Sequence, residues 1–82
     1  MEDINKQVGK RIRVLRENRG FSQEELASNS GLHRSHMGQI ERGESNVTVR
    51  TLERIGLALH VPVFEFLRDV APAGRSGMKK EL

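Results

Sequence analysis

The chain has 82 residues, which leaves room for one domain with a thin core and little room for a deep enzyme cleft. It contains no cysteine, and this excludes a disulfide framework, thiol chemistry and a cysteine-based zinc site. Lysine and arginine number 14 against 11 acidic residues, a modest net charge of +3 whose distribution matters more than its size. No stretch approaches the roughly 20 apolar residues of a membrane span, and the first residues are polar, so we expect a cytoplasmic protein without membrane contact.

The first segment has the apolar spacing of an amphipathic helix. We predict a helix over about residues 4–19, which Asp3 would cap and Gly20 would end. Its apolar stripe consists of Ile4, Val8, Ile12 and Leu15. The segment also holds a basic cluster made of Lys10, Arg11, Arg13, Arg16 and Arg19. Such a cluster favours a polyanionic partner, although a solvated helix face explains the charge equally well.

Two short helices are predicted next, separated by a turn that contains glycine. Ser22 and Glu25 have the spacing of a capping box, which indicates that a helix begins there and runs over about 23–29. Gly31 lies in the turn, and a third helix over about 34–41 follows it. Two helices of about two turns each, joined in this way, are typical of the DNA-binding helix-turn-helix.

The remaining segments predict two more helices and a tail. Thr48 can cap a fourth helix over about 49–59, and Pro62 can open a short fifth helix. Residues 71–82 contain several helix breakers and show no periodicity, so we expect a flexible tail there. The expected architecture is therefore an all-α, five-helix domain over residues 1–70.

The exposed side of the third predicted helix carries residue types that read base edges. In a helix-turn-helix this element lies in the major groove, while the preceding helix crosses the DNA backbone. Arginine can hold guanine, glutamine can hold adenine, and serine can bond to several bases, which points to Arg34, Gln39 and Ser35. Gly38 inside a helix costs about 1 kcal/mol relative to alanine, and close approach of DNA is one explanation.

In this order and spacing, the motifs resemble those of the phage-repressor and Cro-like helix-turn-helix regulators. The resemblance covers roughly residues 8–68. It rests on residues 12–17, 21–27, 31–32, 40–44 and 51–55. It implies a lambda-repressor-like fold and a dimer bound to a palindromic operator in double-stranded DNA. Lone short domains of this kind include phage repressors, restriction–modification controller proteins and antitoxins.

The resemblance also implies a role for individual residues. The expected base-reading residues are Arg34, Ser35 and Gln39. Contacts to the DNA backbone, or close approach to it, are expected from Arg11, Gln23, His33, His36, Gly38, Arg42, Ser45 and Asn46. Arg16 and Glu41 match a mostly buried ion pair between the first and third helices, so both are expected to be structural rather than DNA ligands.

A dimer contact is expected near the fifth helix. Phe64 stands where the family usually has a polar residue, and with Val63 or Val70 it could pack against a second copy. The alternative is that the tail folds over it. Two copies would read half-sites about 34 Å apart, which is one turn of DNA.

The sequence also bears on partners and functions other than DNA binding by a dimer. RNA polymerase is an expected partner where the operator lies just upstream of a promoter, and Glu24 or Glu25 would make that contact. The absence of a second domain argues against a small-molecule ligand, and no cofactor or enzyme activity is expected. His33 and His36 lack a third metal ligand nearby. The rival hypothesis is a protein-interaction module such as an antitoxin, with DNA binding secondary.

Overall fold

The computed structural model describes residues 3–71, which form four α-helices and one short 3-10 helix. The elements are α1 (Ile4–Asn18), α2 (Gln23–Ser30), α3 (Arg34–Glu41), α4 (Val49–Leu59) and the 3-10 helix η1 (Val63–Phe66). Within this range there is no strand, and no helix is long and apolar enough to cross a membrane. The predicted all-α fold is therefore confirmed.

The predicted count of five helices is wrong in its last element. After Pro62 the chain makes one turn of 3-10 helix and then leaves helical geometry, with Asp69 in the left-handed region at φ 63°. The side chain of Gln7 on α1 donates to the carbonyl of Ala71 at 2.6 Å and accepts from its N–H at 2.9 Å. These two bonds fix the first residue of the expected tail along α1. The rest of that segment, 72–82, lies outside the described residues.

Side-chain caps begin three of the helices where the sequence predicts them. Asp3 accepts a hydrogen bond from the Lys6 N–H at 3.0 Å, and Thr48 accepts one from the Thr51 N–H at 3.0 Å. Ser22 and Glu25 form both bonds of the capping box, at 3.0 and 2.8 Å. Because these caps satisfy N–H groups that have no partner within the helix, they set the start of each element locally.

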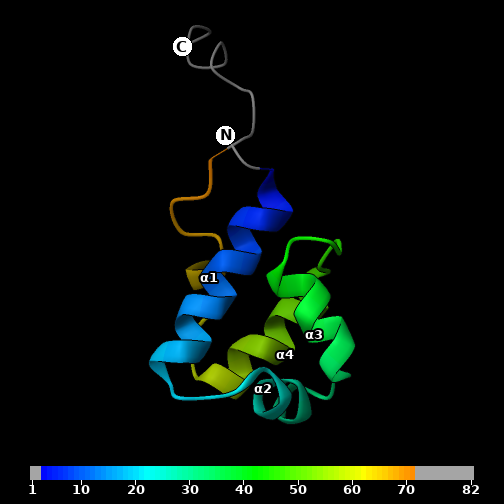
Figure 1. The fold of residues 1–82 in the computed structure, drawn as a ribbon. Helices are drawn as coiled ribbons and strands as arrows, with labels where there is room; N and C mark the ends of the chain where they lie inside the picture. The colour runs from blue at the N-terminus through cyan, green and yellow to red at the C-terminus, as the bar shows by residue number, and fades with distance from the viewer. Residues whose placement is uncertain (1–2, 72–82) are drawn as a thin grey trace, which may run out of the picture.

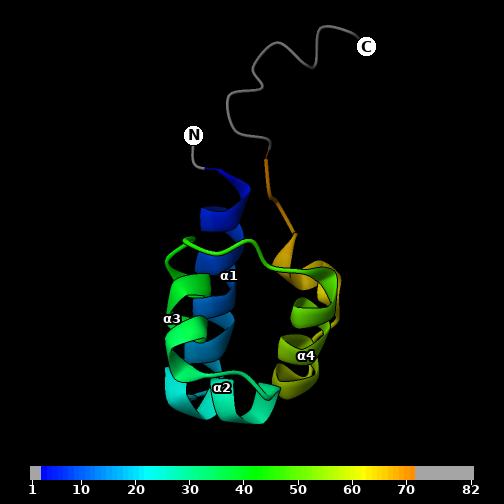
Figure 2. The same cartoon turned by 90° about the vertical axis from the view of Figure 1, so that its right-hand side faces the viewer.

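The helices enclose one core, with α1 and α3 side by side, α2 across one end and α4 behind them (Figure 1). Seen from the side, the chain after α3 crosses to α4 at the end of the molecule opposite α2 (Figure 2). The buried apolar residues are Val8, Ile12, Leu26, Ala27, Met37, Ile40, Leu52, Ile55, Leu59 and Phe66. All four α-helices and η1 contribute to this core. An isolated eight-residue helix is unstable in water, so α2 and α3 depend on this packing.

A buried ion pair joins α1 to the end of α3. Arg16 and Glu41 are only 8% and 7% exposed, and Nε and Nη2 of Arg16 donate to the two oxygens of Glu41 at 2.7 and 3.1 Å. The remaining terminal nitrogen of Arg16 donates to the carbonyl of Phe21 at 2.8 Å. The hydrogen bond to Glu41 raises the pKa of the Arg16 guanidinium above its usual range. The guanidinium therefore remains charged, and its bonds to Glu41 fix α3 against α1.

Gly9 lets α1 and α3 approach closely. A Cβ at this position would lie 2.7 Å from the Glu41 carbonyl oxygen and even closer to that of Ile40. Both are backbone atoms of α3, which cannot move away from an added methyl group as the end of a flexible side chain can. The distance between the two helices therefore depends on the absence of a side chain at Gly9.

We expect Gly9→Ala to lower the free energy of unfolding by about 1–3 kcal/mol, because the added methyl group forces α1 and α3 apart. Urea denaturation followed by circular dichroism measures the change. Gly38→Ala is the matched control, since a Cβ there would meet the flexible end of Arg42 at 3.0 Å. Alanine also favours a helix over glycine by about 1 kcal/mol. Equal destabilisation by the two substitutions would contradict this interpretation.

We expect Arg16→Met to lower the free energy of unfolding by about 3–5 kcal/mol, because it leaves the Glu41 carboxylate buried without its cation. The double variant Arg16→Met/Glu41→Leu removes both charges and should be more stable than the single variant. The free energies of unfolding in urea of the wild type, Arg16→Met, Glu41→Leu and the double variant give the coupling energy between the two residues. A loss below about 1 kcal/mol in the single variant would show that the pair is not needed for stability.

Candidate nucleic-acid interface

A shallow polar hollow extends from the start of α2 over the exposed side of α3. It is lined by Gln23, Arg34, Ser35, Gly38, Gln39 and Arg42. All six belong to the set that sequence reasoning assigns to DNA contact, including the three expected to read bases. The turn at Gly31, in the left-handed region at φ 72°, reverses the chain between the two helices and brings these residues together.

Gln23 links this hollow to the buried ion pair. Its Nε2 donates to Oε1 of Glu41 at 2.9 Å, which orients the amide over the seam between α2 and α3. An amide NH2 group has two donors, so one N–H of Gln23 can reach a ligand while the other holds Glu41. The side chain also sits in the first turn of α2, where the helix dipole favours an anion.

Gly38 has a structural role that the sequence did not show. It is buried in α3, and a Cβ there would lie 3.0 Å from a terminal nitrogen of Arg42 and 3.7 Å from Oε1 of Gln23. The glycine therefore makes room for two side chains of the hollow. This supplements the sequence-based explanation, which invoked only the approach of DNA.

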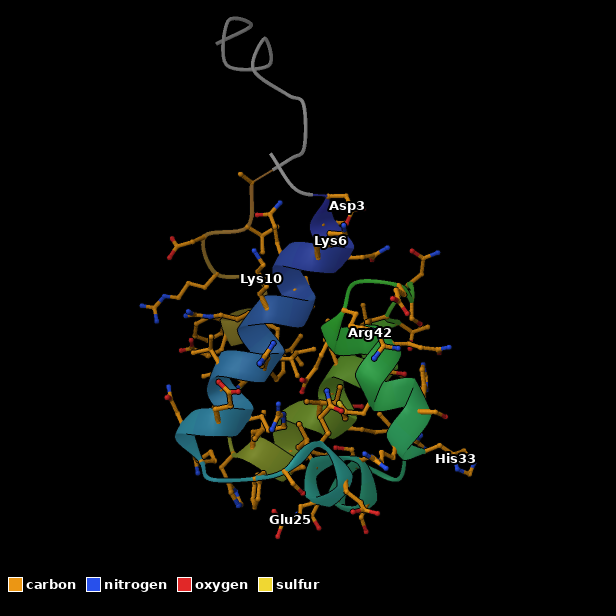
Figure 3. The ribbon with its side chains drawn as sticks, viewed as in Figure 1. Asp3, Lys6, Lys10, Glu25, His33 and Arg42 are labelled. Carbon is orange, nitrogen blue, oxygen red and sulfur yellow. The ribbon has the colours of Figure 1, made fainter. Side chains whose placement is uncertain are left out.

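The two histidines do not line the hollow. His33 is the N-cap residue of α3, makes no side-chain cap hydrogen bond, and points outward from the end of the helix (Figure 3). His36 is half-buried. Within residues 3–71, no group of three or more His, Cys, Asp or Glu side chains is placed to hold a metal ion.

The segment after α3 lies over the N-terminal part of α1. Asn46 accepts a hydrogen bond at 2.7 Å from the side chain of Asn5, while Ser45 is half-buried. Arg42 is exposed and donates to Glu44 at 3.1 Å. That hydrogen bond lowers the pKa of the Glu44 carboxyl group, so it remains charged down to a lower pH than usual. Arg42 is therefore available at the surface, with a carboxylate as its present partner.

Arg11 does not line this hollow, and its expected contact with the DNA backbone stays a prediction. Its Nε donates to the Glu65 carbonyl at 3.0 Å, and its Nη2 lies 3.6 Å from Oε1 of the same residue. The reason is geometric. One side of α1 packs on α3 and another packs on η1, and Arg11 lies on the side that faces η1.

Sequence reasoning missed a second hollow, between α1 and the end of α3. It is lined by Lys6, Lys10, Arg13, Glu41 and Arg42. Figure 3 labels Lys6 and Lys10 on α1 and Arg42 at the facing end of α3. The available signal was the spacing of Lys6, Lys10 and Arg13, which is four and then three residues and places them on one helix face. The sequence shows the basic cluster, but it does not show which neighbouring element each of its side chains faces.

The three residues expected at a dimer contact differ in exposure. Phe64 is 62% exposed on η1, whereas Val63 and Val70 are half-buried and pack against the core. Leu57 is 72% exposed on α4, the helix against which η1 packs. Phe64 and Leu57 are therefore exposed apolar side chains on two elements that pack together.

Comparison with known proteins places this geometry in a family. The model of the helix-turn-helix domain matches residues 7–66. The chain is 39% identical over 79 residues to control protein C.SmaI of Serratia marcescens, which covers 96% of this chain and 87% of that protein. Two further relatives are longer proteins, and the match covers 38% of the length of one and 62% of the length of the other.

Two solved structures show the same arrangement of helices. The restriction–modification controller protein C.AhdI from Aeromonas hydrophila has a TM-score of 0.73 and 41% identity, covering 74% of this chain and 92% of that one. The biofilm regulator SinR, solved in complex with DNA, has a TM-score of 0.70 and 34% identity, covering 73% and 97%. The chain therefore belongs to the helix-turn-helix domain family of DNA-binding transcription regulators.

Proposed function

We propose that the chain is a sequence-specific regulator that binds a palindromic operator in double-stranded DNA as a homodimer, with α3 in the major groove. The single observation that supports this most strongly is the hollow over α2 and α3, whose lining contains arginine, serine and glutamine together at an exposed helix face. Such a face supplies donors and acceptors for base edges rather than charge alone. A regulator of this kind acts in the cytoplasm, where prokaryotic and phage DNA is found.

The residues of the interface divide into two groups by position. Arg34, Ser35 and Gln39 lie on the exposed face of α3 and are proposed to read bases. Gln23 and Arg42 lie at the edges of that face and are proposed to bind phosphates, which sets the register of the protein on the duplex. Asn46 is exposed in the segment after α3 and extends the phosphate contacts.

Dimerisation follows from the size of the recognition element. A helix of eight residues is about 12 Å long and reaches only a few base pairs. Two copies on a twofold axis read two half-sites about one DNA turn apart. The exposed ring of Phe64 is the proposed centre of the contact between the copies. The half-buried positions of Val63 and Val70 make them supports for this surface rather than its centre.

Contact with RNA polymerase is proposed for the outer side of α2. Glu24 and Glu25 are exposed there and line a shallow hollow with neighbouring residues of the helix. Glu25 also holds the Ser22 N–H in the capping box, so Glu24 is better placed for an external partner. An operator that overlaps the promoter implies repression, and one just upstream allows activation through this face.

Selection from a random duplex library, with the full chain at about physiological salt, tests the proposed function. We expect enrichment of a palindrome with half-sites about 10 base pairs apart. Uniform, salt-sensitive binding without enrichment would overturn sequence-specific regulation and favour a protein-interaction module such as an antitoxin.

Arg34→Ala and Arg42→Ala should have different effects in that experiment. Arg34→Ala should cost about 1–3 kcal/mol of operator binding and relax the preference at one base pair in each half-site. Arg42→Ala should weaken binding to all sequences alike and reduce the dependence of affinity on salt. Repeating the selection with each variant measures both effects, and an unaltered preference in Arg34→Ala would remove it from the base-reading group.

Phe64→Glu should shift the protein toward the monomer, because it places a charge at the centre of the proposed apolar contact. Analytical ultracentrifugation over a range of concentrations measures the shift, and operator affinity should fall with it. Val14→Glu is the matched control, since Val14 is also exposed, at 47%, but lies on α1. If Phe64→Glu sediments like the wild type, the dimer contact lies elsewhere.

A further inference from the structure

We propose that α1 adds a row of phosphate contacts beside the recognition helix, made by Lys6, Lys10 and Arg13, with Arg42 at its inner edge. This inference rests on the proposed function, because the anion it names is the DNA backbone that flanks α3. It extends that function to an element outside the helix-turn-helix. We refer to Lys6, Lys10 and Arg13 as the α1 basic row, which Arg42 adjoins.

The position of Arg42 connects the row to the proposed DNA surface. Arg42 lines both hollows, the one over α2 and α3 and the one between α1 and α3. A phosphate strand that meets Arg42 at the edge of the major groove can therefore continue along α1. Gly43 follows directly, and a Cβ there would lie 2.7 Å from the Lys6 Cα, so the end of α3 is in close contact with α1 at this point.

The spacing of the row fits a nucleic-acid strand. Lys6 and Arg13 are seven residues apart on one face of α1, which is about 10 Å along the helix axis. The same length, measured along the duplex axis, covers about three base-pair rises of 3.4 Å. Two to three basic side chains on this face therefore match two to three consecutive phosphates.

The carboxylate at the bottom of the second hollow does not oppose an anion there. Glu41 lines the hollow, yet its two oxygens accept bonds from Arg16 at 2.7 and 3.1 Å and one from Gln23 at 2.9 Å. Its charge is compensated by a buried guanidinium. The exposed charges at the rim of the hollow are consequently dominated by the basic row.

Exposed carboxylates compete with phosphate for Arg13 of the row and for the adjoining Arg42. Glu17 accepts from Arg13 at 3.2 Å, and Glu44 accepts from Arg42 at 3.1 Å. Both pairs are formed by side chains that are more than half exposed, where ion pairs contribute little and exchange readily for a stronger anion. The phosphates of a duplex, which the base-reading helix holds in place, are such an anion.

The test compares two exposed arginines at different places on the surface, each of which pairs with a nearby glutamate. Arg13 is 64% exposed and pairs with Glu17 one turn away, while Arg68 is 57% exposed and pairs with Glu65 one turn away, beside η1. Arg13→Gln and Arg68→Gln therefore remove the same charge and the same kind of ion pair. Affinity of the full chain for the selected operator and for a random duplex is measured from about 50 to 200 mM salt.

We expect Arg13→Gln to flatten the slope of log affinity against log salt by about 0.9, and Lys6→Gln/Arg13→Gln to flatten it by roughly twice as much. Operator and random duplex should weaken by the same factor, because the row reads no bases. Arg68→Gln should leave the slope unchanged. Equal slopes for Arg13→Gln and the wild type, with Arg42→Ala still effective, would overturn the α1 row and leave the proposed function intact. A wild-type chain that binds no duplex at all would overturn the proposed function itself.

Thermal unfolding of each variant checks that the substitution leaves the stability of the fold unchanged. Arg13 and Arg68 are both exposed, so both variants should unfold at the temperature of the wild type.

An acidic protein surface is the alternative partner of the row. In that case Arg13→Gln would leave both duplex affinities unchanged, and the result would count against the inference.

Discussion

The carboxylate of Glu41 is the point at which three helices of this domain are joined. It receives Arg16 from α1 and Gln23 from α2, while it belongs itself to the last turn of α3. Helices of eight residues have little stability of their own, so their mutual orientation must come from tertiary contacts. Because the ion pair is buried, a shift of α3 relative to α1 would leave a charge without compensation, and this disfavours other packings of the two helices.

The arginines of α1 show that position, rather than net charge, decides what a basic residue does. Arg16 is buried and holds α3, whereas Arg11 lies against η1 and bonds to Glu65. Arg13 remains at the surface beside the end of α3. A single basic cluster in the sequence is thus divided among the core, a helix contact and a surface. Of these three arginines, only Arg13 is left at the surface beside the end of α3.

Much of the fold was predictable because its signals are local. The capping box at Ser22 and the cap at Thr48 act within one helical turn, so the sequence alone places those helix starts. In the hollow, the residues on the exposed face of α3 were predictable from short-range patterns, whereas Gln23 and Arg42 were predicted from the family resemblance. The direction of Arg11 was not, because it depends on how α1 is rotated relative to η1. The path of the chain at Ala71, after η1, likewise depends on its distant bonds to Gln7.

The acidic residues at the rim of the interface have a consequence for specificity. Glu44 is bonded to Arg42, and that bond lowers the pKa of its carboxyl group, so it remains negative even in mildly acidic solution. Any phosphate that approaches Arg42 must displace this carboxylate and overcome its repulsion. Random DNA offers only phosphates in return, whereas an operator would also offer the base contacts proposed for Arg34 and Gln39. The competing carboxylates lower the phosphate contribution by the same factor for both kinds of DNA, so discrimination between them rests on the proposed base-reading residues of α3.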